Sequence, residues 1–323
     1  MVALIRLLLT LGIVGGLIKL FSNEDQVISE NSNCQDEFLT FNRNLNIPAS
    51  KLKRLKRARR AIQKAIKSYF QIQNGFSIPK FALQGSYATG TMIRTAKDMC
   101  DFDLGIYFFE EPSKTYETIQ NHIKRALTGH TTVGISLLPR CVRLKYRGDF
   151  HIDMPIYYTL DEKAFYLGAR GDEWELCDSK VFKDWVADKT KESLQSIRII
   201  RYFKAWADHY RTKKRTKMPS GLVFTIWSIR FYQSHERDDV AFVHTAAAIL
   251  KHLKDNFQFT WTCVMPVAPN DNVLDKLNKQ QQVNFRDTLE ELVSKGFEAL
   301  TFDNKAKAAK AWGKLLGGRF PSF

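Results

Sequence analysis

Two aspartates interrupt an otherwise apolar, alternating stretch, MCDFDLGIYFF (99–109). The alternation predicts a β-strand with Phe102 and Leu104 on one face. Asp101 and Asp103 then share the other face, about 6.6 Å apart along the strand. Two carboxylates that face one pocket repel each other, and a divalent cation between them relieves that cost. The stretch therefore predicts a sheet whose one face is apolar and whose other face carries an acidic site.

A third carboxylate lies on a later strand. RCVRLKYRGDFHIDMPIYY (140–158) has the pattern of two alternating strands around a Tyr-Arg-Gly-Asp turn, and Asp153 lies in the second strand between two apolar residues. Three converging strand carboxylates are the ligand set that a two-Mg²⁺ phosphoryl-transfer site needs. We expect Asp101 and Asp103 to bridge both ions, and Asp153 to hold the ion that activates the attacking hydroxyl. All three are predicted to be catalytic and metal-binding.

The periodicity changes from strand-like to helical at about residue 180. Helices are predicted over 193–211, 221–235, 240–256 and 283–300. A strand-rich half followed by a helical half indicates an α+β protein with a sheet lobe and a C-terminal helical lobe. We expect a catalytic lobe over 49–180 and a helical lobe over 181–323 that completes the cleft.

The basic charge is concentrated near the N-terminus. The chain has 49 Lys and Arg against 34 Asp and Glu, and thirteen of the basic residues lie in positions 38–97, which contain no acid. Within this region, KLKRLKRARRAIQKAIKSYF (51–70) has apolar residues at helical spacing. One interpretation is a long helix whose apolar stripe packs against the protein and whose basic side chains are exposed to solvent. The other is a surface that binds the phosphates of RNA or DNA.

The first 21 residues are apolar, but Arg6 and Lys19 shorten the uninterrupted run to 7–18. Twelve helical residues span about 18 Å, less than the ~30 Å hydrocarbon core. A membrane anchor and a packed or interfacial helix both remain open. Residues 22–48 are mostly polar and are predicted to be a linker.

Five scattered cysteines without a C-x-x-C pair exclude a disulfide framework and a zinc site. Such cysteine usage is typical of a reducing compartment. We therefore expect a cytoplasmic protein, which would contact the membrane only if the N-terminal segment is an anchor.

A glycine-rich turn follows the first predicted strand, in FALQGSYATGT (81–91). Gly85 to Gly90 has the spacing of a phosphate loop, but Thr91-Met92 stands where Lys-Ser/Thr is required, which excludes a P-loop NTPase. The turn can still bind phosphate, because Gly85 lets backbone N–H groups approach closely and Ser86 adds a hydroxyl.

The order of three motifs resembles that of the polymerase-β-type nucleotidyltransferases. These are Gln-Gly-Ser, then Asp-Phe-Asp beginning fifteen positions after the Ser, then His-Ile-Asp on a later strand. Within this superfamily, the chain is most similar to the cGAS/DncV-like nucleotidyltransferases (CD-NTases), which make cyclic oligonucleotide messengers in bacterial anti-phage signalling. RIIRYFKAWADHYR resembles the helix whose Lys contacts the donor triphosphate, here Lys204. MPSGLVFTIW resembles the next helix start, whose Ser touches phosphate, here Ser220. The resemblance covers about 50–320.

This resemblance implies a polymerase-β-like sheet lobe, a helical lobe and a long N-terminal helix bridging them. The nucleotide-binding residues that it implies are Gln84, Gly85, Ser86, Lys204 and Ser220. On their own, a lysine on an amphipathic helix is usually solvated and a serine before a helix is usually an N-cap. The gap before Asp101 is long, and Asp98 is a rival ligand, but its offset places it on the wrong strand face.

The activity implied is Mg²⁺-dependent condensation of NTPs, ATP or GTP among them, into a cyclic di- or trinucleotide with release of pyrophosphate. Two Mg²⁺ ions are expected, with Mn²⁺ as a substitute, and regulatory proteins of the same defence system are candidate partners. Activation by nucleic acid is conceivable through the helix 51–70, although no Cys/His insertion could form a zinc clamp. The alternatives are an enzyme that extends RNA or modifies a small molecule with a linear product, and a tethered binding protein with an inactive fold.

Overall fold

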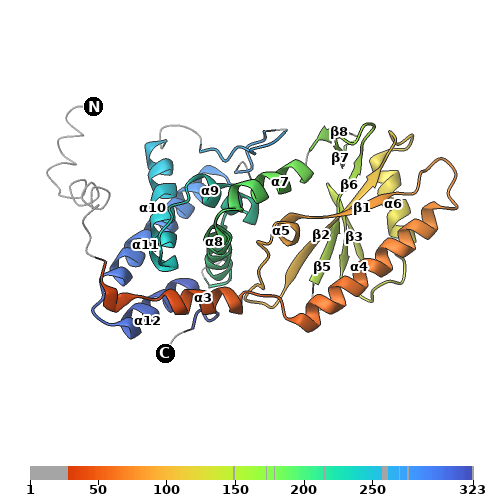
Figure 1. Ribbon diagram of the computed structural model, residues 1–323. Coiled ribbons are helices and arrows are strands. Elements are labelled where there is room, and N and C mark those ends of the chain that lie inside the picture. The colour runs from red at the N-terminus through yellow and green to blue at the C-terminus, as the bar shows by residue number, and fades with distance from the viewer. Residues whose placement is uncertain are drawn as a thin grey trace.

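The computed structural model describes residues 28–147, 150–171, 173–177, 179–213, 216–256, 261–268, 270–274 and 276–321. It has two lobes, a sheet lobe and a helical lobe, which lie side by side (Figure 1). The elements in chain order are η1 (Glu30–Ser32), α3 (Gln35–Asn44), α4 (Ala49–Phe70), β1 (Lys80–Gln84), α5 (Gly85–Ala88), β2 (Cys100–Phe108), α6 (Tyr116–Ala126), β3 (Ile135–Leu138), β4 (Cys141–Lys145), β5 (Phe150–Met154), β6 (Ile156–Tyr158), β7 (Tyr166–Ala169), β8 (Glu173–Leu176), α7 (Ser179–Thr190), α8 (Leu194–Lys213), α9 (Gly221–Arg230), α10 (Asp238–Asp255), α11 (Lys279–Leu300) and α12 (Lys305–Leu316).

The mixed sheet is built around β2. On one side, β2 pairs antiparallel with β1, and on the other it pairs parallel with β5 and β6, which are separated only by Pro155. β4 and β7 extend the sheet beyond β5 and β6, and β3 and β8 lie outermost. The strands predicted around 81–84, over 99–109 and over 140–158 are confirmed; the tip of the predicted Tyr-Arg-Gly-Asp turn falls outside the described residues.

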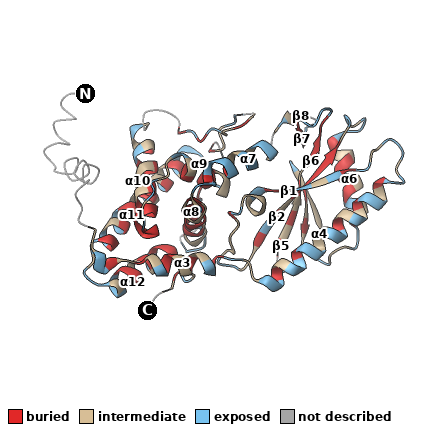
Figure 2. Cartoon of the chain, in the orientation of Figure 1, coloured by how far each residue is buried: buried red, intermediate tan, exposed pale blue. Residues whose placement is uncertain are grey.

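Helices α4 and α6 cover the apolar face of the sheet. Phe102 and Leu104 of β2 are buried in one cluster with Leu55, Ile62 and Ile66 of α4. Most of the basic residues of α4 occupy its opposite side, which is exposed in Figure 2, whereas Lys51 is buried. The predicted apolar stripe of this helix therefore packs against the sheet. Because strand residues alternate between faces, the other face of β2 is left to the aspartates.

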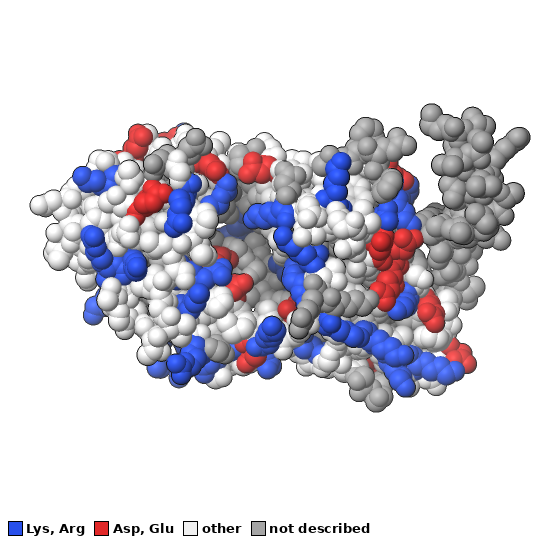
Figure 3. Space-filling view, turned by 180° about the vertical axis from the view of Figure 1, so that it is seen from behind, with Lys and Arg blue, Asp and Glu red and all other residues white. Residues whose placement is uncertain are grey.

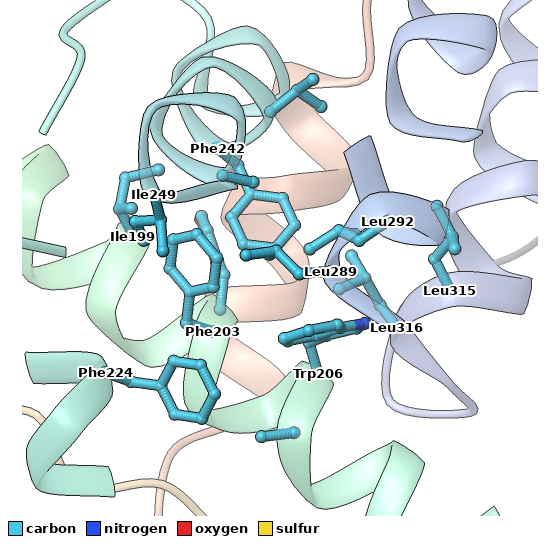
Figure 4. Close-up of a cluster of buried hydrophobic side chains, with 14 of the residues drawn as sticks. Ile199, Phe203, Trp206, Phe224, Phe242, Ile249, Leu289, Leu292, Leu315 and Leu316 are labelled. Carbon is cyan, nitrogen blue, oxygen red and sulfur yellow. The ribbon is translucent and has the colours of Figure 1, made fainter. Parts of the chain in front are cut away.

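The helical lobe has its own core, organised around α8. Phe203 and Trp206 of this helix lie among side chains from α9, α10, α11 and α12 (Figure 4). The helices predicted over 193–211, 240–256 and 283–300 correspond to α8, α10 and α11. The helix predicted over 221–235 was too long, because α9 ends at Arg230. Beyond it, the hydroxyl of Tyr232 donates to Gln195 and the backbone N–H of Gln233 donates to Thr245, so tertiary hydrogen bonds replace the helical ones.

Residues within the predicted linker 22–48 form helix α3, which packs into the helical lobe. Phe38 and Phe41 of α3 are fully buried, and both rings contact the rings of Tyr202 and Phe320. The segment is mostly polar in composition, but it contains two aromatic residues three positions apart, which is the spacing that places side chains on one face of a helix. Residues 28–44 are thus part of the fold.

All five cysteines are free thiols. Within the described ranges, none of the helices has the length and apolar character needed to cross a membrane. The predicted hydrophobic segment 1–21 falls outside these ranges, so its role as an anchor stays a prediction.

Candidate active site

The strand register sets four polar residues in one row across the sheet. Asp103 of β2 lies opposite Gln84 of β1 on one side and opposite Asp153 of β5 on the other. Arg143 of β4 lies opposite Asp153. Directly opposed residues on adjacent strands project from the same face, and the strands are about 4.8 Å apart. Asp101, two positions before Asp103, points to that face too, so the structure brings the three predicted carboxylates together.

The surroundings of Asp103 perturb its pKa. Burial raises its pKa to about 6, and the neighbouring charges of Asp153 and Asp101 add to this effect. Arg143 and Lys204 act in the opposite direction without cancelling it. The site therefore holds more negative charge than the protein neutralises, which is the electrostatic condition in which a divalent cation binds favourably.

Asp153 is held by Arg143 through two charge-assisted hydrogen bonds. Arg143 Nε donates to Oδ1 and Nη2 donates to Oδ2, both at 2.6 Å. Both carboxylate oxygens are thus in use, and among the described residues no three His, Cys, Asp or Glu side chains are already arranged as a metal shell. The donor set fits divalent metal ions if Arg143 gives way or shares Asp153 with them.

The turn after β1 is packed directly against the acidic site. Gly85 has a φ of +60°, and a Cβ atom there would lie 1.9 Å from Oδ2 of Asp103. Glycine is therefore required both by the backbone conformation and by the contact. Gly85 begins the short helix α5, and Thr91 N–H closes the turn by donating to the carbonyl of Ser86 at 2.9 Å.

The side chain of Gln84 is buried and fully engaged. Its Nε2 donates to the hydroxyl of Tyr107 and, at 2.8 Å, to Ser179 Oγ. Its Oε1 accepts from the hydroxyl of Tyr157 at 3.2 Å. In this structure Gln84 fixes the end of β1, and hence the glycine turn, to β2, β6 and the start of α7.

Lys204 reaches the same cavity from the helical lobe. Its Nζ donates to Thr91 Oγ1 at 2.7 Å. Burial lowers its pKa to about 7, and the charge of Arg201 lowers it further, whereas Asp103 raises it. The ammonium group is thus poorly compensated, as expected of a group that binds an anionic ligand.

Ser220 is the N-cap of α9, and its hydroxyl accepts a hydrogen bond from Val223 N–H at 3.4 Å. The side chain is exposed, but it is not among those that line the cavity. The next residue, Gly221, does line it and lies against Lys204, because a Cβ there would be 3.4 Å from the lysine Cε. The helix start is therefore where the resemblance implies, with the hydroxyl at the edge of the site.

These residues surround a cavity of about 660 Å³ between the lobes. Seen from behind, the surface is hollowed between the two lobes, with acidic and basic side chains gathered around the hollow (Figure 3). Lining residues that the sequence did not single out are Thr91, Tyr157, Asp208, Arg211, Met265 and Lys276. Apart from Asp208 and Arg211, which both lie on α8, they come from separate parts of the chain, so no local motif marks the set.

Asp98, the rival ligand, is engaged elsewhere. It precedes β2 with a φ of +58°, and its carboxylate pairs with Arg94 at 2.6 Å and with Lys51 at 3.2 Å. Arg143 could have been found from the sequence by pairing the two alternating strands of 140–158 about their turn, which sets it opposite Asp153.

Comparison with known proteins identifies the sheet lobe. The family described as cyclic GMP-AMP synthase DncV-like, nucleotidyltransferase domain, matches residues 79–157, which include the glycine turn and all three aspartates. The matched residues therefore form a nucleotidyltransferase domain, of a kind that generally depends on metal ions, and the resemblance drawn from the motifs of this lobe is confirmed.

Two proteins to which this chain is similar are named as cyclic dinucleotide synthases. The chain is 28% identical to a cyclic GMP-AMP synthase of Escherichia albertii in an alignment of 190 residues that covers 54% of this chain and 42% of that enzyme. It is 24% identical to a c-di-GMP synthase of Roseivirga ehrenbergii in an alignment of 255 residues that covers 69% of this chain and 67% of that enzyme. The match thus spans less than half the length of the first relative.

Solved structures share the two-lobed fold. The cyclic AMP-GMP synthase DncV of Vibrio cholerae superposes with a TM-score of 0.75 at 15% identity, over 90% of this chain and 98% of that one. The CD-NTase CdnG of Bradyrhizobium diazoefficiens, solved in complex with GTP, gives a TM-score of 0.71 at 14% identity, over 88% and 95%. The predicted α+β fold, a sheet lobe with a C-terminal helical lobe and a long N-terminal helix, is confirmed.

Proposed function

We propose that this protein condenses nucleoside triphosphates, ATP or GTP among them, into a cyclic di- or trinucleotide and releases pyrophosphate. The observation that carries the proposal is the strand register that sets Asp103 beside Asp153, with Asp101 on the same face, in the cleft between the lobes. The names of the two synthases to which the chain is similar support it.

The donor triphosphate would lie between the glycine turn and Lys204, which line the same cavity from opposite lobes. Backbone N–H groups near Gly85 can approach phosphate oxygens closely because no side chain intervenes. Ser86 adds a hydroxyl on one side, and Ser220 offers its hydroxyl at the edge of the cavity. The lysine supplies the compact positive charge that suits a phosphate.

Asp101, Asp103 and Asp153 would hold two Mg²⁺ ions, with Mn²⁺ as a substitute. When bound, such ions neutralise the charge that develops on the leaving pyrophosphate and favour ionisation of the attacking hydroxyl. Asp153 would orient the 2′- or 3′-hydroxyl of the acceptor nucleotide. The hydroxyl oxygen forms the bond to the donor α-phosphorus, the bond from that phosphorus to pyrophosphate breaks, and the hydroxyl proton passes to solvent water. A further round on the linear intermediate closes the ring.

In the cell, we propose a role in bacterial anti-phage signalling, with regulatory proteins of the same defence system as partners. A linear product made on RNA is the second candidate, and it is favoured by the exposed basic face of α4. Lys53, Arg57 and Arg60 line a shallow cavity on this helix, which lies on the far side of the sheet from the aspartates. Such a surface would hold a polynucleotide by its phosphates.

The deciding experiment is mass spectrometry of the products formed from all four NTPs with Mg²⁺ or Mn²⁺, before and after phosphatase treatment. A cyclic product resists phosphatase, whereas a linear chain loses its terminal phosphates. Asp101→Asn combined with Asp103→Asn should abolish pyrophosphate release. Asp98→Asn, an aspartate three residues away and outside the cleft, is the matched control and should retain it. Undiminished turnover in the double variant would refute the assignment, and a phosphatase-sensitive product would favour the second candidate.

A further inference from the structure

A second cavity lies in the helical lobe, between α8, α11 and α12. It has a volume of about 570 Å³, within the range of small-molecule sites. Its lining contains five lysines against two glutamates. One of these glutamates, Glu291, is already paired with Lys295 at 2.6 Å. The cavity therefore has an excess of positive charge.

Helix α12 contributes three of the lysines, Lys307, Lys310 and Lys314, at i, i+3 and i+7. This spacing places the three lysines on one face of the helix, along about 10 Å of its length. A row of that length matches a polyphosphate chain and is longer than a single phosphate group. Lys307 is paired with Asp303 at 3.3 Å, whereas Lys310 and Lys314 have no acidic partner within the described part of the chain. A row of basic side chains is visible along the edge of the helical lobe where α12 lies (Figure 3). Like charges at this spacing destabilise a helix unless an anion binds between them.

The cavity also contains a buried polar atom that lacks a partner. His209 lines it from α8, and its Nε2 is buried without a hydrogen bond. Such an atom costs free energy unless a ligand or water satisfies it. Phe302 and Ala311, both partly buried, add an apolar patch to the lining.

This cavity is separate from the nucleotide cleft. Lys204, Asp208 and Arg211 of α8 line the cleft, whereas His209, Tyr210 and Lys213 line the second cavity. At about 100° per residue, the two sets lie on opposite sides of the helix.

We propose that this cavity is a second binding site for a nucleoside polyphosphate. The row of α12 lysines holds the phosphate chain, and the patch of Phe302 and Ala311 with His209 Nε2 receives the base. A concave site with a partly buried imidazole suits a small ligand better than the flat surface of a macromolecule.

The test is isothermal titration of the full chain with inorganic tripolyphosphate, without divalent metal and at low ionic strength, where exposed charges act most strongly. Two sites are expected in the natural protein. Lys310→Glu with Lys314→Glu should weaken one site at least tenfold, and Lys204→Met should remove the other. The control Lys124→Glu with Lys279→Glu makes the same change in net charge at exposed residues that line neither cavity.

Equal binding by the charge-reversed and control variants would overturn the proposal, as would loss of all binding in Lys204→Met. If the variant with Lys310→Glu and Lys314→Glu does not fold, the variant with Lys310→Gln and Lys314→Gln replaces it. This second variant is compared with the natural protein in the same way, and it changes the net charge by less. Repeating the titration with a nonhydrolysable GTP analogue tests the base: tighter second-site binding than tripolyphosphate supports a nucleotide, and weaker binding contradicts it. None of these readouts requires turnover, so the cyclic synthase proposal can fail while this one stands.

Discussion

The pKa of Lys204 predicts that nucleotide binding takes up a proton. In the free protein, burial lowers this pKa to about 7, so half of the molecules carry an uncharged amine at that pH. A triphosphate beside the nitrogen would return the pKa toward the ordinary lysine value of ~10.4. Affinity should therefore be highest below pH 7, where the lysine is already charged, and should fall as the pH rises.

The size of the effect follows from proton linkage. With a pKa of about 7 in the free protein and ~10.4 in the complex, affinity should fall about fivefold from pH 7 to pH 8 and about fiftyfold from pH 7 to pH 9. About 0.9 proton should be taken up per nucleotide at pH 8. Asp103 contributes little in this range, because its pKa is about 6 and the carboxylate is mostly ionised above pH 7.

The assay is titration calorimetry with a nonhydrolysable nucleoside triphosphate from pH 7 to pH 9, in buffers of different ionisation enthalpy, which reports proton uptake directly. Lys204→Met should bind more weakly at pH 7 and show a much flatter pH dependence. Lys276→Met removes another lysine of the same cavity and should preserve the slope. Binding independent of pH in the natural protein, or an unchanged slope in Lys204→Met, would refute the reasoning.

Three further predictions concern the same site. Burying Lys204 in its charged form destabilises the folded protein, so Lys204→Met should raise the melting temperature of the free protein at pH 7. The gain should be smaller at pH 10, because the lysine of the unfolded chain also begins to lose its proton there. Scanning calorimetry at both pH values measures the gain, and an equal gain at both would argue against this reasoning. Gly85→Ala should reduce turnover by about two orders of magnitude or more, because the new Cβ meets the Asp103 carboxylate. Gly90→Ala is the control: Gly90 has a similar φ of +71° but open space around it, so this variant should show only the cost of backbone strain. Similar activities in the two variants would exclude the contact with Asp103 as the cause. Arg143→Ala should destabilise the metal-free protein by about 3 kcal/mol, because it leaves a mostly buried carboxylate unpaired; the value is the lower end for a buried ion pair because both side chains are partly exposed. Millimolar Mg²⁺ should raise the melting temperature of this variant more than that of the natural protein. An equal rise in both would show that the metal does not replace the arginine.

The sequence alone determined which face of the sheet carries the aspartates and where the glycine turn lies. Alternation over 99–109 placed Asp101 and Asp103 on the face opposite Phe102 and Leu104, because side-chain direction on a strand depends only on position along the chain. The glycine turn was equally readable, since a backbone conformation at positive φ selects glycine. These signals are local, so no knowledge of the fold was needed to read them.

The tertiary structure decided which groups meet across separate elements. Thr91 binds Lys204 across the two lobes, and α3 enters the core of the helical lobe because its two phenylalanines find partners there, despite the polar character of the segment. The face of α8 turned away from the cleft likewise acquired its cavity only through the packing of α11 and α12. Such contacts depend on strand register and helix packing between distant segments, and neither is encoded in the spacing of residues along one element.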